Sequence, residues 1–506
     1  MTKVLLVGEG ARENAIAEAI TRSAHEPALF AIMKINNPGI AKLCKSSGGE
    51  AALGDSLDPA SVAKAAEKFR VDMVFIGPEE PQFRGVADEL EKRGIACVGA
   101  KQGAARVEMS KAFMRKLMWK YNVPGRLRFK SFTNVEDAVA YIQEYAESIA
   151  LKPARQAGGK GVKVIADLQV YLTSEKQRVK AEHAKDIHDR HMAEYTDIDD
   201  KILIEERVEG PEYTLQAFTD GRTVKPLPLV QDNKNAFEMD IGPETGGMGT
   251  ISGKGLTLPF ITQDEYRKTA EIVEEVVKAT EKETGIRYKG VIAGQSMLTA
   301  LWGPTIIEFY SRLGDPEAVN AMPILKTDMI DLMEAIVGEC LHKLNLEFED
   351  TATVVKCVSP KGYPYRRDLA TGHPVRLDEG LLKKHGCKAY WGSAELKSDG
   401  NIITGGSRIV EIFASADSIP EAGERVEKCV PCVSLTDGWG TFHRSDIGSE
   451  TLLRRRIEQA NLIRDVYRYR MGKNLVGVTL DWIPGRGLIK HGYKTTQEDH
   501  RFSNGG

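Results

Sequence analysis

The stretch Val4-Leu5-Leu6-Val7-Gly8-Glu9-Gly10-Ala11-Arg12-Glu13-Asn14 decides the fold of the first hundred residues. Four consecutive apolar residues are typical of a strand that is buried on both faces, and the glycine-rich turn after them leads into an amphipathic helix through about Thr21. Val71–Ile76 predicts a second buried strand, which ends at Gly77–Pro81, and Ala96–Val98 predicts a third. Strands that alternate with helices predict an α/β fold with a parallel, doubly wound sheet.

Two polar turns follow predicted strands of this sheet. In doubly wound sheets, ligands bind where the carboxyl ends of the strands meet. We therefore expect Gly8–Asn14 and Gly77–Pro81 to lie close together and to form a binding site. The predicted unit is a Rossmann-like substrate domain over residues 1–103.

The composition excludes several classes of protein. A chain of 506 residues is too long for one core, so three or four subdomains are expected. The net charge of -3 gives no overall attraction to nucleic acid or to a membrane. No apolar run is long enough to span a membrane, and the N-terminus lacks the pattern of a signal peptide, so a cytoplasmic protein is expected. Seven scattered cysteines, including a lone Cys429-Val430-Pro431-Cys432, predict buried free thiols instead of a disulfide framework or a zinc site.

A second glycine-rich segment lies between two predicted strands, Ile149–Lys152 and Val162–Ile165. Its sequence is Arg155-Gln156-Ala157-Gly158-Gly159-Lys160-Gly161. Backbone amides in such a loop can approach phosphate oxygens closely, although the pattern is not that of a P-loop, which opens a helix. Either a flap over a nucleotide or an ordinary hairpin turn fits the sequence. Lys152 and Lys111 carry charges that suit phosphate oxygens.

Three further segments carry polar groups that suit a ligand. Ile202–Glu212 is a predicted strand that runs into an acidic turn, which suits an adenine edge and ribose hydroxyls. Gly242–Gly249 has four glycines in eight residues, and Gln231–Lys234 lies upstream of it at a strand end. Ile306–Glu317 is an apolar strand on which Glu308, Tyr310 and Arg312 would share one face. A carboxylate there can hold a divalent cation, and an arginine can clamp a carboxylate or a phosphate.

The rest of the chain divides by pattern. Residues 104–335 predict a two-lobed central domain, with a smaller lobe at about 125–205, and residues 336–450 predict a small mixed α/β domain. The tail from 451 to 506 has eleven Lys or Arg against five Asp or Glu. A solvated helix face is favoured there over a nucleic-acid patch, because aromatic residues are sparse.

The order of these motifs is specific. It runs from Gly-x-Gly-x-Arg-Glu and Gly-Pro-Glu-x-Pro, through Ser-Lys-Ala-Phe, the Gly-Gly-Lys-Gly loop, Glu-Glu-x-x-x-Gly-x-Glu and Gln-Asp-x-Lys, to Gly-Pro-x-Thr-Gly-Gly-Met-Gly and Glu-Phe-x-x-Arg-x-Gly-Asp-Pro-Glu. Over about residues 3–448 the chain resembles the phosphoribosylamine–glycine ligases of the ATP-grasp superfamily. The resemblance implies an N-terminal pre-ATP-grasp domain, a two-lobed ATP-grasp centre and a small C-terminal domain.

The resemblance also implies a reaction. Members of this family join glycine to 5-phosphoribosylamine in purine biosynthesis, through an acyl phosphate made from ATP. It therefore implies ATP as cosubstrate, Mg²⁺ or Mn²⁺ as cofactor, small molecules as the only partners, and a monomer or homodimer. Such chemistry needs positioning and charge neutralisation instead of a covalent enzyme nucleophile.

Carried over by motif, the resemblance implies a role for individual residues. The residues implied to bind ATP are Lys111, Lys152, Gly158, Gly159, Lys160, Gly161, Glu205, Glu206, Val208 and Glu212. Those implied to act in the glycine and acyl-phosphate site are Asp232, Arg312 and Asp315. Those implied to bind substrate are Gly10, Arg12, Glu79, Pro81, Gly246, Gly247, Met248 and Gly314. Those implied to bind the metal are Glu308 and, as a candidate second ligand, Gln295.

Four positions depart from the family pattern. Tyr310 stands where the family usually has a metal-binding asparagine, and Asn14 replaces the usual histidine. Asn233 stands where histidine or an aromatic residue is common, and Glu244 replaces a frequent asparagine. Residues beyond about 465 have no family counterpart. Two alternatives therefore remain beside an active ligase of this family. One is a diverged ATP-grasp carboxylate–amine ligase with another substrate pair, and the other is a non-catalytic paralogue that binds a partner through its tail.

Overall fold

The protein is described by a computed structural model. It describes residues 1–144, 149–155, 163–164, 182–192, 198–483 and 487–491. The chain divides into two compact units. Unit 1 comprises Met1–Ala105, Tyr213–Gln295 and Tyr310–Ile457, and unit 2 comprises Arg106–Glu212, Ser296–Phe309 and Glu458–Gly506.

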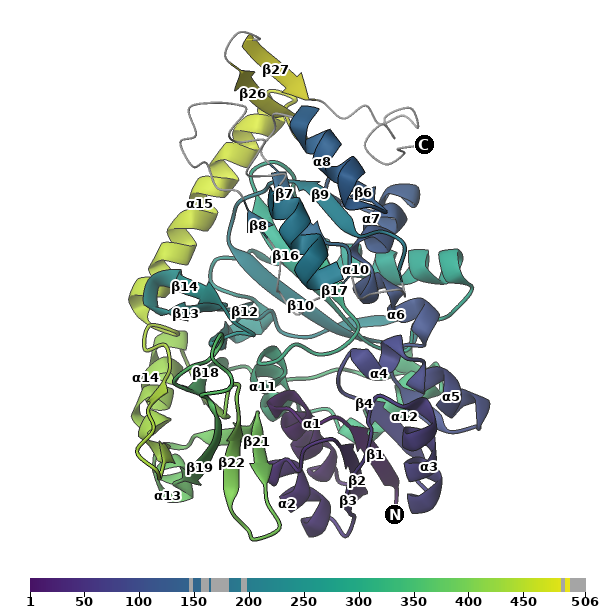
Figure 1. The fold of residues 1–506 in the computed structure, drawn as a ribbon, viewed down its shortest axis with the longest axis vertical. Helices are drawn as coiled ribbons and strands as arrows, with labels where there is room; N and C mark the ends of the chain where they lie inside the picture. Colours follow the sequence, from purple (N-terminus) through teal and green to yellow (C-terminus); the bar gives the residue numbers. More distant parts are fainter. Residues whose placement is uncertain (145–148, 156–162, 165–181, 193–197, 484–486, 492–506) are drawn as a thin grey trace. The chain divides into compact units, whose positions relative to one another are not determined.

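The N-terminal part of unit 1 is the predicted doubly wound sheet (Figure 1). Its parallel strands run in the order β3-β2-β1-β4-β5. Their bounds are β1 (Lys3–Val7), β2 (Ala28–Met33), β3 (Ala51–Leu53), β4 (Met73–Ile76) and β5 (Ala96–Val98). Helices cover both faces, namely α1 (Ala11–Thr21) and α2 (Pro38–Ser46) on one, and α3 (Pro59–Phe69) and α5 (Val86–Lys92) on the other.

Strand β1 shows why an unbroken apolar run was needed. Val4 and Leu6 pack into the cluster that contains α1, whereas Leu5 and Val7 pack into the cluster that contains α3 and α5. All four side chains are fully buried, and each such burial contributes roughly 1.5–3 kcal/mol. The carboxyl ends of β1 and β4 are neighbours in the sheet, so both predicted binding turns lie at one edge, as expected.

A four-stranded sheet forms the central region, in the order β11-β10-β16-β17. Its strands are β10 (Glu212–Thr219), β11 (Val224–Pro226), β16 (Gly290–Thr299) and β17 (Gly303–Tyr310), and the division between the units falls within β10, β16 and β17. The long helix predicted at residues 263–283 is confirmed as α10 (Gln263–Thr284). Thr262 and Glu265 form its capping box, and Gly285 ends it with a positive φ of 71°.

Unit 2 contains an antiparallel sheet in the order β6-β9-β7-β8. The strands are β6 (Phe129–Phe132), β7 (Ile149–Pro153), β8 (Lys163–Val164) and β9 (Ile202–Glu206), so the predicted hairpin of β7 and β8 is confirmed. The helix α8 (Val135–Glu144) packs with this sheet. The sequence predicts a solvated helix and loop for the charged stretch 174–200. Residues 182–192 of it are helical, and they bury Ala184, Ile187 and Met192 in this core.

From Lys101 to about Pro124 the sequence predicts a single helix, but the structure has two. They are α6 (Gln102–Met109) and α7 (Lys111–Lys120). Ser110 separates them with an extended backbone, and its hydroxyl accepts a hydrogen bond from the amide of Phe113. A serine hydroxyl that caps a new helix competes with continuation of the old one, which is why the prediction was wrong here.

The C-terminal part of unit 1 combines two antiparallel sheets with helices α13 (Glu379–His385) and α14 (Ile419–Cys429), and is the expected small mixed α/β region. The larger sheet contains β12 (Gln231–Asp232), β15 (Gly249–Ser252), β18 (Ala352–Pro360), β23 (Val410–Ala416) and β20 (Lys388–Trp391), with β25 (Thr441–Phe442) paired to β18. The smaller sheet contains β21 (Ala394–Leu396), β22 (Ile402–Gly405), β19 (Thr371–Leu377) and β24 (Val433–Leu435). The chain turns between β22 and β23 at Gly406, which has a φ of 83°.

The tail begins with the predicted helix, α15 (Glu450–Gly472), on which Arg454 and Arg455 are exposed. A hairpin of β26 (Thr479–Ile483) and β27 (Gly487–His491) follows it. All seven cysteines are free, as predicted, and five of them are buried. Among the described residues, no helix combines the length and the apolar character needed to cross a membrane.

Candidate active site

Glu79 in unit 1 lies between two arginines that the sequence assigned to different substrates. Its Oε2 is 3.3 Å from Nε of Arg312 and 4.0 Å from Nη1 of Arg12. Burial acts to raise the pKa of Glu79, but Arg312 and then Arg12 hold it below its usual range. Both guanidinium groups also donate to the carbonyl oxygen of Leu313, at 3.1 Å from Arg12 and 3.3 Å from Arg312. Residues predicted for the amine substrate and for the acyl-phosphate site thus form one charged network.

Gly10 is the N-cap of α1 and lies against Asp315. A Cβ at Gly10 would lie 3.1 Å from Oδ2 of Asp315 and 2.8 Å from the carboxylate of Glu13, so any side chain would displace them. Glu13 accepts from the amide of Gly10 at 2.7 Å and pairs with Nε of Arg12 at 2.5 Å, which fixes the turn. Pro81 is buried in the short helix α4 (Glu80–Phe83).

Strand β17 ends at Tyr310, so Arg312 does not lie on the strand as expected. The guanidinium carbon of Arg312 nevertheless lies 4.3 Å from the ring centre of Tyr310, which keeps the two side chains together by stacking. The hydroxyl of Tyr310 donates a hydrogen bond to Oε1 of Gln295, on β16. The amide oxygen expected to bind a metal is thus a hydrogen-bond acceptor of a phenol.

The glycine-rich loop 242–249 covers Asp232. Gly247 has a φ of 110°, and a Cβ there would lie 2.6 Å from Oδ1 of Asp232 and 2.8 Å from Pro316. Oδ1 of Asp232 is buried and has no hydrogen-bond partner. Burial and then the carboxylate of Glu317 raise the pKa of Asp232 well above its usual value. Oδ1 of this carboxyl group therefore lacks a hydrogen-bond donor, which a bound ammonium group would supply.

The remaining residues of this loop are fixed by neighbours in unit 1. Met248 is fully buried, and the amide of Gly246 donates to the hydroxyl of Tyr363 at 2.8 Å. The amide of Gly314, in the turn after β17, donates to Oε1 of Gln216 at 2.8 Å.

The negative charge of Asp315 is balanced by Arg408, an arginine that the sequence analysis missed. Nη2 of Arg408 donates to Oδ1 of Asp315 at 2.5 Å. Burial acts to raise the pKa of Asp315, but Arg408 and then Arg12 lower it to about 2. Asp315 is therefore an ionised carboxylate at neutral pH.

Two of the departures from the family pattern hold backbone in place. Oδ1 of Asn14 accepts from the amide of Trp391 at 2.9 Å, and Nδ2 of Asn233 donates to the carbonyl oxygen of Gly249 at 3.1 Å. Both side chains are buried. Glu244, by contrast, is an exposed residue of β14 (Ile241–Glu244).

In unit 2, two lysines predicted for phosphate binding lie against carboxylates. Nζ of Lys152 is 2.7 Å from Oε2 of Glu205, and Nζ of Lys111 is 3.2 Å from Oε2 of Glu308. Both lysines are buried. Burial acts to raise the pKa of Glu205, but Arg115 and Lys152 lower it to about 2. The carboxylate of Glu205 thus orients Lys152, and it is paired with both Arg115 and Lys152.

Arg115 is the residue of this cluster that the sequence analysis missed. It is fully buried and bonds Glu205 through Nε. Its Nη1 and Nη2 donate to the carbonyl oxygens of Ile306 and Ile307, at 2.9 Å and 2.8 Å, which places the next residue, Glu308. The signal was present, because Arg115 follows Lys111 by four residues on α7 and so shares its face.

The other predicted nucleotide residues differ in their surroundings. Glu206 accepts from Arg128 at 2.8 Å and 3.0 Å and from the indole of Trp302 at 3.1 Å, so it stabilises the lobe. Val208 is half-buried in the loop between β9 and β10, and Glu212 begins β10. Gly158, Gly159, Lys160 and Gly161 lie outside the described residues.

Unit 2 has a four-stranded antiparallel sheet, two buried lysines and the carboxylate of Glu308 on β17. Together with the doubly wound sheet of unit 1, these features define an ATP-grasp ligase. Three domain models of phosphoribosylglycinamide synthetase match the chain, namely the N domain at residues 2–108, the ATP-grasp domain at 109–318 and the C domain at 353–450. The chain belongs to the phosphoribosylglycinamide synthetase family.

Curated relatives support this family, and solved structures share its fold. Phosphoribosylamine–glycine ligases of Methanobrevibacter smithii and Methanopyrus kandleri are each 42% identical to the chain, over 90% and 92% of it and over 98% and 100% of their own lengths. The crystal structure of the Thermotoga maritima phosphoribosylamine–glycine ligase has the same fold, with a TM-score of 0.69 at 24% identity, and covers 88% of this chain and 100% of its own. The biotin carboxylase domain of Hydrogenobacter thermophilus 2-oxoglutarate carboxylase shares the fold with a TM-score of 0.64 at 16% identity, over 95% of this chain and 99% of its own.

Proposed function

We propose that the chain joins glycine to 5-phosphoribosylamine through glycyl phosphate, and so forms glycinamide ribonucleotide, ADP and phosphate in de novo purine biosynthesis. The observation that carries this proposal is the 42% identity to ligases of that name over nine-tenths of the chain. The site supports it, because it offers cationic and carboxylate groups and, among the residues assigned to it, no serine or cysteine nucleophile.

In the first step a glycine carboxylate oxygen attacks the γ-phosphorus of ATP, and ADP leaves with the electron pair of the broken P–O bond. We assign Lys111 and Lys152 to the phosphate oxygens, where buried positive charge stabilises the transferring group. Glu205 and Arg115 hold Lys152 in place. We also assign Gly158, Gly159, Lys160 and Gly161 to the phosphates, and Glu205, Glu206, Val208 and Glu212 to the nucleotide side of the site.

A divalent cation, as the family uses, would neutralise phosphate charge at this step. Glu308 offers the hard carboxylate oxygen that Mg²⁺ or Mn²⁺ prefers. Gln295 fits less well, because its amide oxygen accepts a hydrogen bond from Tyr310. We propose Mg²⁺, with Glu308 as its ligand from this chain and Gln295 as a second ligand only once Tyr310 releases it.

We assign the glycine to Asp232 and Arg312. The unpartnered Oδ1 of Asp232 suits the ammonium group, and the guanidinium of Arg312 suits the carboxylate. The loop residues Gly246, Gly247 and Met248 would cover the bound glycine. Gly314 and Asp315 would lie beside it.

In the second step the amine of phosphoribosylamine attacks the acyl carbon. A C–N bond forms, the C–O bond to phosphate breaks, phosphate leaves with the electron pair, and the amine nitrogen loses one proton. We assign Gly10, Arg12, Glu79 and Pro81 to this substrate. We assign the exclusion of water to the glycine-rich segment that connects β7 to β8 in sequence, because water would hydrolyse the acyl phosphate.

The remaining proposals concern the molecule as a whole. We propose domain boundaries at residues 103, 335 and 450, with a basic extension after them. We also propose a cytoplasmic enzyme that acts as a monomer or homodimer.

The test is ADP release with each substrate omitted in turn. The proposal expects release only when ATP, glycine and phosphoribosylamine are all present. Release with another acid or amine but not with glycine would favour a diverged ligase, the alternative suggested by Asn14, Asn233 and Glu244. No release with any pair would favour a non-catalytic relative.

A further inference from the structure

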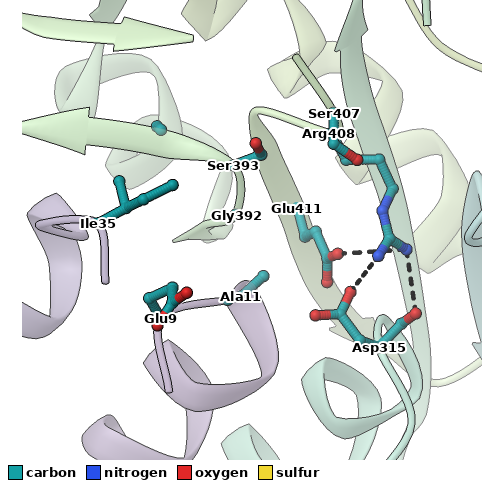
Figure 2. A pocket seen from close by; sticks show the side chains of 11 residues that line it. Glu9, Ala11, Ile35, Asp315, Gly392, Ser393, Ser407, Arg408 and Glu411 are labelled. Atoms are coloured by element: carbon teal, nitrogen blue, oxygen red, sulfur yellow. Dashed lines mark hydrogen bonds and ion pairs between the residues drawn. The ribbon is translucent and has the colours of Figure 1, made fainter. Parts of the chain in front are cut away.

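Glu411, on β23, is a buried acid in unit 1 that no motif identified. Its side chain is 1% exposed. It lines a cavity of about 240 Å³ together with Glu9, Gly10, Ser393, Arg408 and Asp315 (Figure 2). Glu411 and Asp315 therefore line the same cavity, next to Gly10, a residue assigned to phosphoribosylamine.

The guanidinium group of Arg408 lies near both acids but, of the two, is hydrogen-bonded only to Asp315. Arg408 donates to Oδ1 of Asp315 at 2.5 Å and to the backbone carbonyl oxygens of Asp315, Gly246 and Gly247 at 2.8–3.1 Å. It lies 3.7 Å from Oε1 of Glu411, which is beyond hydrogen-bond distance. Oε2 of Glu411 is buried and accepts no hydrogen bond. An ionised Glu411 would thus be a buried charge without a donor.

The other ionisable groups around Glu411 do not change this balance. Glu317, in α11 (Glu317–Ala321), adds a second negative charge, and Cys357 of β18 faces Glu411 as a neutral thiol because burial raises its pKa well above the usual value. Tyr390 of β20 is paired in register with Glu411, and its hydroxyl is bonded to Glu18. Among these described neighbours of Glu411, Arg408 is the only one with a positive charge.

We infer that Glu411 is a neutral carboxylic acid whose hydroxyl donates a hydrogen bond to the Asp315 carboxylate, and that it is a positioning residue for Asp315 in the ligase reaction. This inference rests on the proposed function. Burial and then the charge of Asp315 raise the pKa of Glu411 well above its usual value, as such a pair requires. Held by both Arg408 and Glu411, the Asp315 carboxylate has one fixed orientation in the cavity.

The consequence for activity is a dependence on the proton of Glu411. When that proton leaves at high pH, two buried carboxylates face one guanidinium, and Asp315 must move or gain a proton. The ligase should lose kcat on the alkaline side, in a step that belongs to the Asp315–Glu411 pair.

The test compares Glu411→Gln with Glu411→Leu. Glutamine keeps a neutral donor of the same shape, so we expect kcat within about threefold of the parent at neutral pH and no alkaline loss from this pair. Leucine has no donor, so we expect kcat to fall by about tenfold, as for loss of one hydrogen bond to a charged group. Glu421→Gln, an exposed acid on α14, is the matched control and should leave the pH profile unchanged.

A second measurement does not need activity. Infrared spectra in deuterated buffer should show a carboxylic acid C=O band at neutral pH that disappears in Glu411→Gln and persists in Glu421→Gln. Absence of that band in the parent overturns the inference, as does equal kcat in the Gln and Leu variants. A parent that shows the band but no glycine-dependent ADP release would refute the proposed function and leave the acid pair standing.

Discussion

The hydroxyl of Tyr310 donates a hydrogen bond to the amide oxygen of Gln295, and both side chains are buried. The ring of Tyr310 also carries the guanidinium of Arg312, at 4.3 Å. One side chain therefore connects a candidate metal ligand with the proposed clamp for the glycine carboxylate. A change at Tyr310 should affect metal binding and glycine binding together.

Replacement of Tyr310 by asparagine should lower the magnesium concentration needed for half-maximal activity by about tenfold, the usual size of effects from groups beside a metal ligand. The reason is that an amide oxygen becomes available at 310 and the oxygen of Gln295 is released. Tyr310→Phe is the matched variant, because it releases Gln295 without adding a ligand, and it should show a smaller shift. A magnesium titration that is the same for all three proteins would mean that Gln295 takes no part in metal binding.

Replacement of Asp232 by asparagine should raise the KM for glycine by about 10- to 100-fold, as expected for loss of a hydrogen bond between charged groups. The KM for ATP should change little, because Asp232 is assigned to the ammonium group alone. Asp417→Asn, at a side chain that is 92% exposed, is the control for the same chemical change. Equal effects on glycine and ATP would place Asp232 elsewhere in the site.

Replacement of Arg115 by methionine should lower the free energy of unfolding by about 3–5 kcal/mol, because it leaves Glu205 buried with one cation fewer. Chemical denaturation measures this. Lys116→Met, on the same helix, removes an exposed ion pair with Asp200 and should change stability by no more than about 1 kcal/mol. Similar losses in the two variants would show that Arg115 contributes only as a surface charge does.

The stability of the protein should fall in acid through Glu205. Its pKa is about 2 in the folded chain against 4.5 as the ordinary value, so its ionised form stabilises the fold above about pH 4.5. That contribution, at most about 3 kcal/mol, is lost as the pH falls from 4.5 toward 2. Glu205→Gln should therefore show a shallower fall of unfolding free energy over this range. An unchanged slope would mean that other carboxylates account for the acid sensitivity.

Sequence reasoning succeeded where periodicity carries the information. The unbroken run Val4–Val7 predicted a strand buried on both faces, and the helix predicted at residues 263–283 agrees closely with α10. It failed where one side chain overrides a pattern, as at Ser110, which starts a new helix within an apparently continuous one. It also failed for Glu411, because its proposed partner Asp315 lies about a hundred residues away in sequence.

The same distinction explains the candidate site. Loops rich in glycine were recognised by composition, and the structure places Gly10 and Gly247 against carboxylates that leave no room for a side chain. Arg408 was missed because an arginine that bonds backbone carbonyls leaves no motif, whereas Arg115 was missed although its spacing from Lys111 places both on one face of α7. Only the folded chain shows which carbonyl oxygens a guanidinium group reaches.

Arg408 also limits how far the surrounding loops can vary in length. Its rigid, planar guanidinium bonds backbone oxygens of the glycine-rich loop and of the turn after β17 at once. One residue inserted between Asp232 and Gly249 would move the carbonyl groups of Gly246 and Gly247 out of register with that plane. A residue inserted at Gly400, in the exposed turn between β21 and β22, would meet no such restriction. Arg408 thus restricts the length of the glycine-rich loop. An insertion in that loop should be tolerated much less well than an insertion at Gly400, although both lie in the same unit.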